Sequence, residues 1–308
     1  MILTDLSQII SASILVPGDC NACAKNPSTQ SKKLIKHFII NSVRANFKSQ
    51  KDQFGKMVLA CDSGSWRYDV FEQYKYKRRQ KRETDDSGIN WSFVSEIKEE
   101  LIDEMNQFFP FYVVKVSKGE GDDIIGVLTK LISEKQPDPD SMDVFGDMSP
   151  EKIRIISSDI DNYQLHKYKN VSQFSPMAKK LVKPDGSARN ALLEKIVKGD
   201  VGDGIMNIRM GSNTFVEGIR QKSITQTYLD TFFASKNPVD MCEDEEQRIN
   251  YNRNEELVSY EKIPAHIAES IILCYNQQLS KKHSKMQLMN YFIKNEMTNL
   301  LSQIHDFY

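Results

Sequence analysis

Three short, mainly apolar runs along the chain each end in an aspartate. They cover residues 2–5, 57–62 and 153–159. Strands that are buried on both faces of a parallel sheet consist of such runs, and these sheets bind ligands in the crevice at the carboxyl ends of their strands. The pattern therefore predicts neighbouring parallel strands that bring Asp5, Asp62 and Asp159 together at one edge of a sheet.

Helical periodicity fills most of the chain between and after these runs. Apolar residues recur every three or four positions over residues 7–16, 31–51, 94–105 and 124–132. A polar loop separates the first two helices, residues 111–116 alternate like a strand, a Pro- and Asp-rich loop covers 136–150, and from residue 190 the pattern is almost wholly helical. Strands that alternate with helices predict an α/β fold with a mainly parallel central sheet flanked by helices. The predicted domains are an α/β domain at residues 1–185 and a helical carboxyl-terminal domain at residues 186–308.

Further acidic residues follow the strand-end aspartates along the chain. These are Glu120, Asp122, Asp123, Asp161, Asp200 and Asp203. Gathered in one pocket, so many carboxylates would repel one another unless cations lay between them. Oxygen ligands without His or Cys suit Mg²⁺ or Mn²⁺ better than zinc. Acids in the first turn of a helix are also common as caps, so residues 120–123 taken alone favour a structural role.

The net charge of -1 is an average over opposed blocks. Residues 66–82 hold seven Lys or Arg against two acids, whereas residues 240–256 are mainly acidic. A basic segment beside a carboxylate pocket predicts an enzyme that binds a polyanion and cuts it. The alternative is a solvated basic helix face; the functional interpretation is preferred because the segment directly follows a strand that ends in a predicted metal ligand.

Composition limits the class of protein. A chain of 308 residues with 40% hydrophobic and 27% charged residues is typical of a soluble globular protein. Five cysteines, an odd number, do not suit a secreted disulfide framework, and the Cys20/Cys23 pair lacks a second ligand pair at zinc spacing. No stretch approaches the roughly 18 apolar residues of a membrane span, and no signal peptide is evident. A cytoplasmic location is expected.

The acids in their order and spacing resemble the signature of the flap endonuclease and 5′-nuclease superfamily, and within it the ribonuclease H group of T-even-type bacteriophages. The resemblance runs from residue 2 to about residue 205 and fades after that. It also rests on the strings at residues 61–62, 66–67, 74–75, 155–159, 164–168 and 198–200. It implies a Mg²⁺-dependent 5′ to 3′ nuclease that acts by a two-metal mechanism. Such an enzyme, a 5′ to 3′ exonuclease or flap endonuclease with ribonuclease H activity, would remove RNA primers from RNA–DNA hybrids, and adjacent DNA or 5′ flaps, during replication in an infected bacterial host.

The resemblance also assigns metal ligands. A first Mg²⁺ would be held by Asp5, Asp62, Asp123 and Asp159, with Glu120 and Asp122 in or just outside its shell. A second Mg²⁺ would be held, largely through water, by Asp161, Asp200 and Asp203. Mn²⁺ is expected to substitute for Mg²⁺. The two ions would generate a hydroxide and stabilise the attacking and leaving oxygens of a phosphoryl displacement, so no side-chain nucleophile is needed.

Nucleic acid would be bound, by the same resemblance, through a basic arch at about residues 66–90 and a helix-loop-helix at about residues 188–215. The catalytic residues would be Lys75, Arg78 and Asp159. The nucleic-acid-binding residues would be Trp66, Arg67, Tyr74, Lys75, Arg78, Arg79, Lys195, Lys198 and Arg209. The polar block at residues 84–90 is expected to be disordered without DNA. Two departures from the family pattern are Gly204, which argues against a potassium site, and Gly121, which should loosen the start of its helix by up to about 1 kcal/mol.

Partners and alternatives complete the expectations. A monomer is expected, with DNA and RNA–DNA hybrids (5′ ends, forks and flaps) as substrates and a single-stranded-DNA-binding protein as a candidate partner. Residues 301–308 echo a sliding-clamp-binding tail, although the end of a packed helix is the preferred interpretation. Two other functions are weighed: a haloacid-dehalogenase-type phosphatase, which would leave Asp5 and Asp62 unexplained, and a non-catalytic forked-DNA-binding protein, for which no expected carboxylate is missing.

Overall fold

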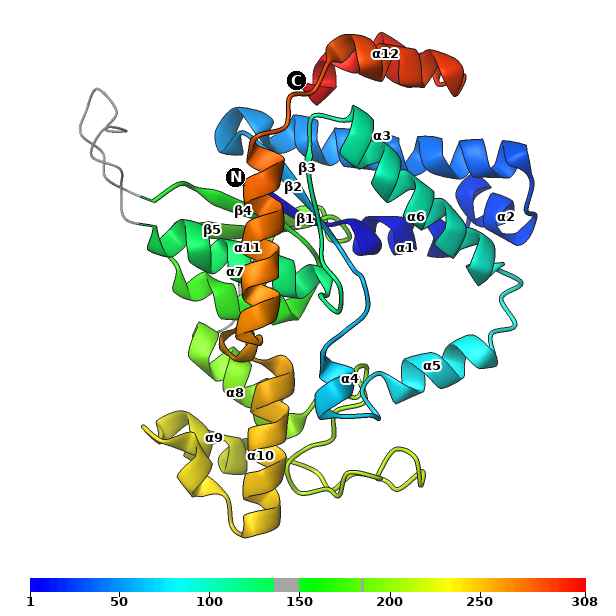
Figure 1. The fold of residues 1–308 in the computed structure, drawn as a ribbon. Helices are drawn as coiled ribbons and strands as arrows, with labels where there is room; N and C mark the ends of the chain where they lie inside the picture. The colour runs from blue at the N-terminus through cyan, green and yellow to red at the C-terminus, as the bar shows by residue number, and fades with distance from the viewer. Residues whose placement is uncertain (136–149, 184–185) are drawn as a thin grey trace.

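The computed structural model describes residues 1–135, 150–183 and 186–308, so all but the last residue of the predicted loop at 136–150 lies outside the described residues. A six-stranded sheet forms the centre, in the order β3-β2-β1-β4-β5-β6 (Figure 1). The strands are β1 (Ile2–Asp5), β2 (Met57–Cys61), β3 (Tyr112–Lys115), β4 (Ile153–Ile156), β5 (Val171–Ser175) and β6 (Lys180–Leu181). Every pairing is parallel except that of β5 with β6. The predicted α/β fold with a mainly parallel sheet is confirmed.

Strand β1 lies at the point where the strand order reverses. The chain continues from β1 to β2 and β3 on one side of it, and later to β4 and β5 on the other. Asp5 pairs in register with Ala60, and Thr4 with Ile156, so the carboxyl ends of β1, β2 and β4 lie level with one another. In such a sheet the crevice at a reversal point is the usual ligand site.

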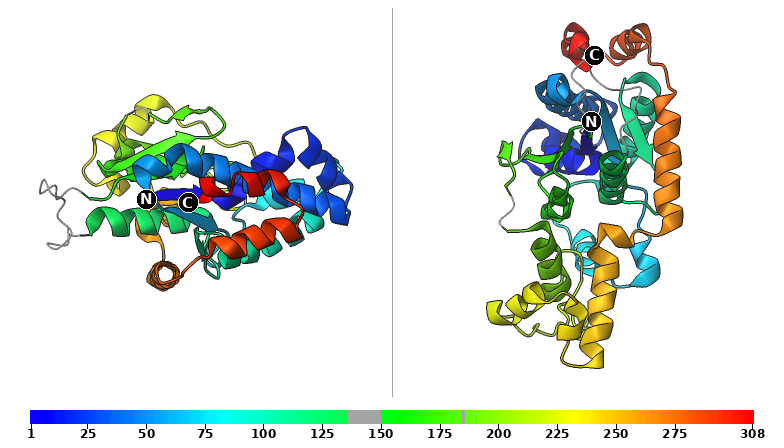
Figure 2. Two further views of the ribbon diagram at one scale, coloured as in Figure 1. Left: turned by 90° about the horizontal axis from the view of Figure 1, so that it is seen from above. Right: turned by 90° about the vertical axis from the view of Figure 1, so that its left-hand side faces the viewer.

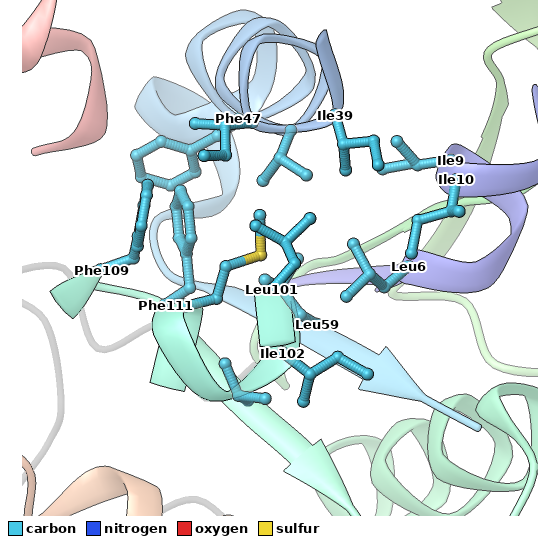
Figure 3. Close-up of a cluster of buried hydrophobic side chains, with 14 of the residues drawn as sticks. Leu6, Ile9, Ile10, Ile39, Phe47, Leu59, Leu101, Ile102, Phe109 and Phe111 are labelled. Atoms are coloured by element: carbon cyan, nitrogen blue, oxygen red, sulfur yellow. The ribbon is translucent and has the colours of Figure 1, made fainter. Parts of the chain in front are cut away.

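Helices cover both faces of the sheet because alternate side chains of each strand point to opposite faces. Ile2 and Leu59 face one hydrophobic core, and Leu3 and Val58 face the other. Figure 3 shows the first core, in which Leu59 meets side chains from several covering helices. The elements on the first face are α1 (Leu6–Leu15), α2 (Asp19–Lys25), α3 (Thr29–Phe54), α6 (Trp91–Phe108), α12 (Lys285–Lys294), α13 (Thr298–Ser302) and η5 (Ile304–Phe307). Those on the second face are α7 (Gly121–Glu134), η2 (Ile160–Lys167), η4 (Tyr260–Lys262) and α11 (Ala265–Leu279).

A third core lies beyond the sheet. It is built from Phe71 and Tyr74, which follow α4 (Arg67–Val70), and from α8 (Ala188–Lys198), the loop after α8, α9 (Gln226–Ala234), η3 (Pro238–Met241) and α10 (Glu245–Val258). This group and α12 lie at opposite ends of the molecule (Figures 1 and 2). The helical part of the chain is therefore divided in its packing, because residues 265–307 return to the two faces of the sheet.

The predicted arch is a helical arm. After α4, the helix α5 (Tyr76–Glu83) leads away toward the start of α6 (Figure 1). Residues 84–90, for which disorder without DNA was expected, follow a defined path here. The Asp85 carboxylate accepts hydrogen bonds from the Ser87 amide, at 3.1 Å, and from the Trp91 indole.

The structure corrects the prediction for the polar loop after residue 16 and decides between the two interpretations of the carboxyl-terminal tail. The polar loop after residue 16 contains the helix α2, which is short but buries Cys20 and Ala24 against the first core. The carboxyl-terminal tail ends a packed helix, as preferred, because Phe307 is only 1% exposed and its ring lies 5.7 Å from that of Phe109. A clamp could not bind this ring without pulling it out of the core. Within the described ranges, no helix has both the length and the apolar character needed to cross a lipid bilayer.

Candidate metal and nucleic-acid site

A cleft of about 540 Å³ opens at the carboxyl edge of the sheet. Each strand-end aspartate there has a structural reason for its place. Asp5 ends β1 and caps α1 by accepting a hydrogen bond from the Gln8 amide at 3.1 Å, and Asp159 follows β4 and caps η2 in the same way. The carboxylates that line the cleft are Asp5, Asp62, Glu120, Asp122, Asp159, Asp161, Asp200 and Asp203. The cleft thus gathers every predicted metal ligand except Asp123.

Asp5, Asp62, Asp122 and Asp159, here called the first cluster, repel one another strongly. Burial and the neighbouring Asp62 raise the pKa of Asp5 to about 7. Burial, followed by Asp159 and Asp5, raises the pKa of Asp122 well above its usual value, and Asp122 Oδ1 is buried without a hydrogen-bond partner. Among the described residues, the one ion pair to this cluster joins Lys98 Nζ to Asp62 at 3.9 Å. A divalent cation would relieve this repulsion and satisfy the buried oxygen.

Gly121 leaves room for the first cluster. Its amide donates a hydrogen bond to Asp62 Oδ1 at 2.6 Å, and a Cβ at this position would lie 3.3 Å from carboxylate oxygens of both Asp5 and Asp62. A capping box holds the start of α7. The Glu120 side chain accepts a hydrogen bond from the backbone amide of Asp123, and the Asp123 side chain accepts one from the backbone amide of Glu120. The glycine was predicted only to loosen the helix start, but in the structure it also keeps the space between two carboxylates open.

Asp161, Asp200 and Asp203, here called the second cluster, offer oxygens that all lie within 4.8 Å of one another. Lys195 forms ion pairs with Asp161 and, at 2.9 Å, with Asp200. Arg78 lies 2.7 Å from Asp203. Burial raises the pKa of Asp161 to about 6 although Lys195 opposes the change, whereas at Asp200 burial is outweighed by Lys195 and the pKa falls. This cluster therefore carries protein cations of its own.

Asp123 does not lie in the cleft. It is fully buried and accepts hydrogen bonds from Arg67 Nη2 at 2.8 Å, from Trp66 Nε1 at 3.2 Å and from the Glu120 amide at 3.0 Å. Successive helical residues point about 100° apart, and at this turn Asp122 lines the cleft whereas Asp123 is directed to Arg67 and Trp66. In the structure Asp122 lines the cleft, at the position that was predicted for Asp123.

Three residues predicted to contact nucleic acid are internal. Trp66, Arg67 and Tyr74 are between 2% and 4% exposed. Arg67 Nε donates to the Leu257 carbonyl at 2.6 Å, and the Tyr74 hydroxyl donates to Glu120 at 3.0 Å. Burial and the carboxylates of Asp203 and Glu120 raise the pKa of Tyr74. These side chains fix the base of the arch to α7 and cannot stack on a base in this arrangement.

The remaining predicted cations occupy two places. Lys75, Arg78, Arg79 and Lys195 line the cleft. Lys75 forms an ion pair with Glu120, and Arg79 Nη1 donates to the Tyr74 carbonyl at 2.7 Å. Lys198 and Arg209 lie outside the cleft, where they pair with Glu194 at 2.5 Å and with Glu243 at 2.7 Å.

The arch base and the loop after α8 are joined directly. The Lys75 amide donates a hydrogen bond to the Asp203 carbonyl at 2.7 Å. Gly204 has φ +73°, and a Cβ there would lie 2.9 Å from the Gln73 carbonyl oxygen. A glycine is needed at this junction for both reasons.

Sequence reasoning missed several residues that line the cleft, among them Lys98 and Tyr260. Lys98, on α6, lines the cleft beside Asp62. Tyr260, on η4, also lines it, and burial together with Asp122 and Asp161 raises the pKa of this tyrosine well above its usual value. Lys98 follows the polar side of a predicted helix, but no sequence pattern says which part of that side meets the cleft.

Known proteins resemble the chain along nearly its whole length. It is 34% identical over 282 residues to the ribonuclease H of Enterobacteria phage T4. The matched region covers 89% of this chain and 87% of the relative. The chain belongs to the phage T4 ribonuclease H family. A model of the carboxyl-terminal part of this family, T4 RNase H, C terminal, matches residues 186–307. As a member of the ribonuclease H family it is a nuclease of the hydrolase class, and the phosphatase alternative is removed.

Solved structures share the fold. The T5 D15 protein co-crystallised with metal ions has a TM-score of 0.56 at 15% identity, over 90% of this chain and 97% of that one. The flap endonuclease of bacteriophage T5, in a pseudo-enzyme-product complex with DNA and metal ions, has a TM-score of 0.59 at 15% identity over the same shares. A T5 5′-exonuclease with bound zinc has a TM-score of 0.55 at 17% identity, over 91% and 98%. This ribonuclease H family member thus has the fold of the T5 enzymes.

Proposed function

We propose that this protein is a divalent-metal-dependent 5′ to 3′ nuclease that hydrolyses phosphodiester bonds in RNA–DNA hybrids, and in adjacent DNA or 5′ flaps, during replication. The observation that carries the proposal is the cleft at the carboxyl edge of the sheet, which gathers carboxylates from distant segments; three of them offer oxygens that lie within 4.8 Å of one another. Ribonuclease H is the name of the T4 relative, and the related T5 structure holds DNA and metal ions.

The cleft fits Mg²⁺ or Mn²⁺. Its described lining offers carboxylate oxygens as ligands, together with Lys and Arg side chains, and contains neither His nor Cys, which suits hard cations. Asp5, Asp62, Asp122 and Asp159 would hold a first ion, and Asp161, Asp200 and Asp203 a second, with Glu120 beside the first. Bound ions of this kind lower the pKa of a water molecule and stabilise charge on the phosphate oxygens.

Lys75 and Arg78 would act on the scissile phosphate as fixed positive charges. Burial alone would lower the pKa of Lys75, but Glu120 and Asp203 outweigh it and the pKa is raised. The ion pair with Glu120 favours the protonated form of Lys75. Cations held beside the developing charge of a phosphoryl group lower the barrier without reorganising during the reaction.

Duplex binding would depend on the backbone and not on the bases. Lys198 and Arg209 lie on the outer side of the α8 region, where surface ion pairs with Glu194 and Glu243 are weak enough to be exchanged for phosphates. Phosphate contacts position a duplex but do not read its sequence. Substrate choice would then follow strand ends and helix shape.

The oligomeric state, the location and the partners of the protein are also proposals. A monomer acting in the cytoplasm of an infected bacterium is in keeping with the phage origin of the T4 relative. A single-stranded-DNA-binding partner stays a prediction. Burial of Phe307 counts against clamp binding through the carboxyl-terminal tail.

The test uses a 5′-labelled RNA–DNA hybrid and a 5′-flap duplex, each incubated with the protein in Mg²⁺ or in EDTA. Short labelled products that appear only with Mg²⁺ are the expected result. Binding of both substrates in Mg²⁺ without any cutting would favour the non-catalytic forked-DNA-binding alternative and end the proposal.

A further inference from the structure

An ammonium group sits among the oxygens of the second cluster. Lys195, on α8, contacts Asp161 and lies 2.9 Å from Asp200, two of the three residues whose oxygens converge there. Its side chain is only 13% exposed, so it is not a mobile surface lysine that happens to lie nearby. A cation of the protein thus occupies the place where a divalent ion would find its oxygen ligands.

Lys195 reaches the second cluster from α8 through a flexible four-carbon side chain. Rotation of this side chain would move the ammonium group away from Asp161 and Asp200 and leave their oxygens to another cation.

Lys195 and a divalent ion at the second cluster would compete. Both are attracted to the carboxylates of Asp161 and Asp200, and like charges at a few ångströms repel each other. No comparable barrier exists at the first cluster, where the described cation is Lys98, 3.9 Å from Asp62 alone.

We propose that Lys195 is a built-in counter-ion of the second cluster that a divalent ion must displace, so that the two clusters bind ions in a fixed order with the first cluster filled first. The proposal rests on the proposed function, because it takes the two clusters as metal sites. Lys195 acts here through Asp161 and Asp200 and is a positioning residue. Its neighbour Lys198, one turn along α8, pairs with Glu194 on the surface and serves as a matched control.

The experiment is a titration of the full-length protein with Mn²⁺ in the absence of nucleic acid, in which free Mn²⁺ is followed by electron paramagnetic resonance. The wild type should bind one ion tightly and a second more weakly. Lys195→Met and Lys195→Gln, which remove the charge, should strengthen binding of the second ion about tenfold or more and change the first by less than about twofold. Lys195→Arg and Lys198→Met should behave like the wild type.

Thermal unfolding supplies a second readout that also shows whether each variant folds. In EDTA, Lys195→Met and Lys195→Gln should melt at a lower temperature than the wild type, because Asp161 and Asp200 lose their counter-ion. Saturating Mn²⁺ should raise the melting temperature of these two variants by more than it raises that of the wild type. Lys198→Met should show the wild-type rise.

The proposal is overturned if both neutral variants bind the second ion no more tightly than the wild type, or if the wild type binds two ions with equal affinity. Its failure is distinct from failure of the proposed function. Cleavage of the hybrid together with unchanged Mn²⁺ affinities would remove only the role of Lys195. Ordered Mn²⁺ binding in a protein that cuts neither substrate would keep the role of Lys195 and remove the nuclease.

Discussion

The two carboxylate clusters share one cleft but hold their negative charge differently. In the first cluster, repulsion and burial are expressed as raised pKa values at Asp5 and Asp122. In the second cluster, Lys195 and Arg78 pair with the carboxylates. The first cluster has one described ion pair, whereas each carboxylate of the second cluster contacts Lys195 or Arg78. Even so, burial raises the pKa of Asp161 in the second cluster to about 6.

The two clusters therefore support a metal site for different reasons. Buried carboxylates that lack counter-charge cost stability, and chains keep them where chemistry requires them. Paired carboxylates are compatible with a purely structural role, but the second cluster is the described group whose oxygens lie within 4.8 Å of one another. The first cluster supports a metal site through its scarcity of counter-charge, and the second supports one through its geometry.

Asp159→Asn should have the largest effect, because Asp159 adds repulsion at both Asp5 and Asp161 and so lies between the clusters. Single-turnover cleavage of the RNA–DNA hybrid should fall by about a thousandfold or more, since metal-ion stabilisation is worth several kcal/mol. Duplex binding should change little. Asp103→Asn, at an exposed acid of α6, is the control and should cut normally. Retained turnover in Asp159→Asn would remove this residue from the metal site.

Lys75→Ala tests whether the cations at the cleft act on chemistry. Lys75 sits against Glu120 beside the first cluster, so its loss should slow single-turnover cleavage about a hundredfold and weaken substrate binding by less than about threefold. Lys81→Ala, at an exposed position of α5, should leave the rate nearly unchanged. A loss of affinity with an unchanged rate would limit Lys75 to positioning of the phosphate.

The pH dependence of stability sharpens the contrast for the first cluster. The pKa of Asp5 is raised from 3.8 to about 7, so between these values the folded state keeps a proton that the unfolded state has lost. The free energy of unfolding in EDTA should therefore fall by about 2 kcal/mol or more as pH rises from about 4 to 7, and should then level off. Mg²⁺ should remove most of this fall.

Melting temperatures at pH 5 and pH 8 measure the effect. In EDTA the value at pH 8 should be lower by about 4 °C or more. Asp5→Asn should flatten the difference because the titrating group is gone. Equal melting temperatures of the wild type at the two pH values would show that the first cluster carries no such strain.

Gly204→Ala tests the connection between the second cluster and the arch. The backbone at Gly204 and Gly218 has φ of +73° and +67°, but only at Gly204 would a Cβ meet the Gln73 carbonyl, at 2.9 Å. Both substitutions should cost about 1 kcal/mol for the left-handed backbone, and Gly204→Ala should cost about 1 kcal/mol more. Urea unfolding of the two variants gives the comparison; equal losses would mean that the junction adapts.

Much of the site could be predicted because strand ends are predictable. Short apolar runs at residues 57–61 and 153–156 are typical of buried parallel strands, and the ends of such strands meet at one edge. The helix α7 could also be predicted, because its apolar residues recur at helical spacing. The pairing of Lys195 could not be predicted, because it depends on how α8 meets η2 across 34 residues of chain.

The arch shows the same limit. The family resemblance predicted nucleic-acid contacts for Trp66, Arg67 and Tyr74, but these three side chains are packed against α7 and α10. Composition reports how many charges a segment carries. Whether a given charge meets solvent, a carboxylate or a carbonyl depends on the neighbouring elements.

By itself, the sequence determined the α/β class, the aspartates at the ends of the strands and the family, because hydrophobic periodicity and ordered motifs are local properties of a chain. Only the tertiary structure decided that Asp122 and not Asp123 faces the cleft, that Lys195 and Arg78 pair with the second cluster, and that the one described ion pair of the first cluster joins Lys98 to Asp62. The physical reason is that electrostatic energy depends on distances of a few ångströms between residues that lie far apart along the chain.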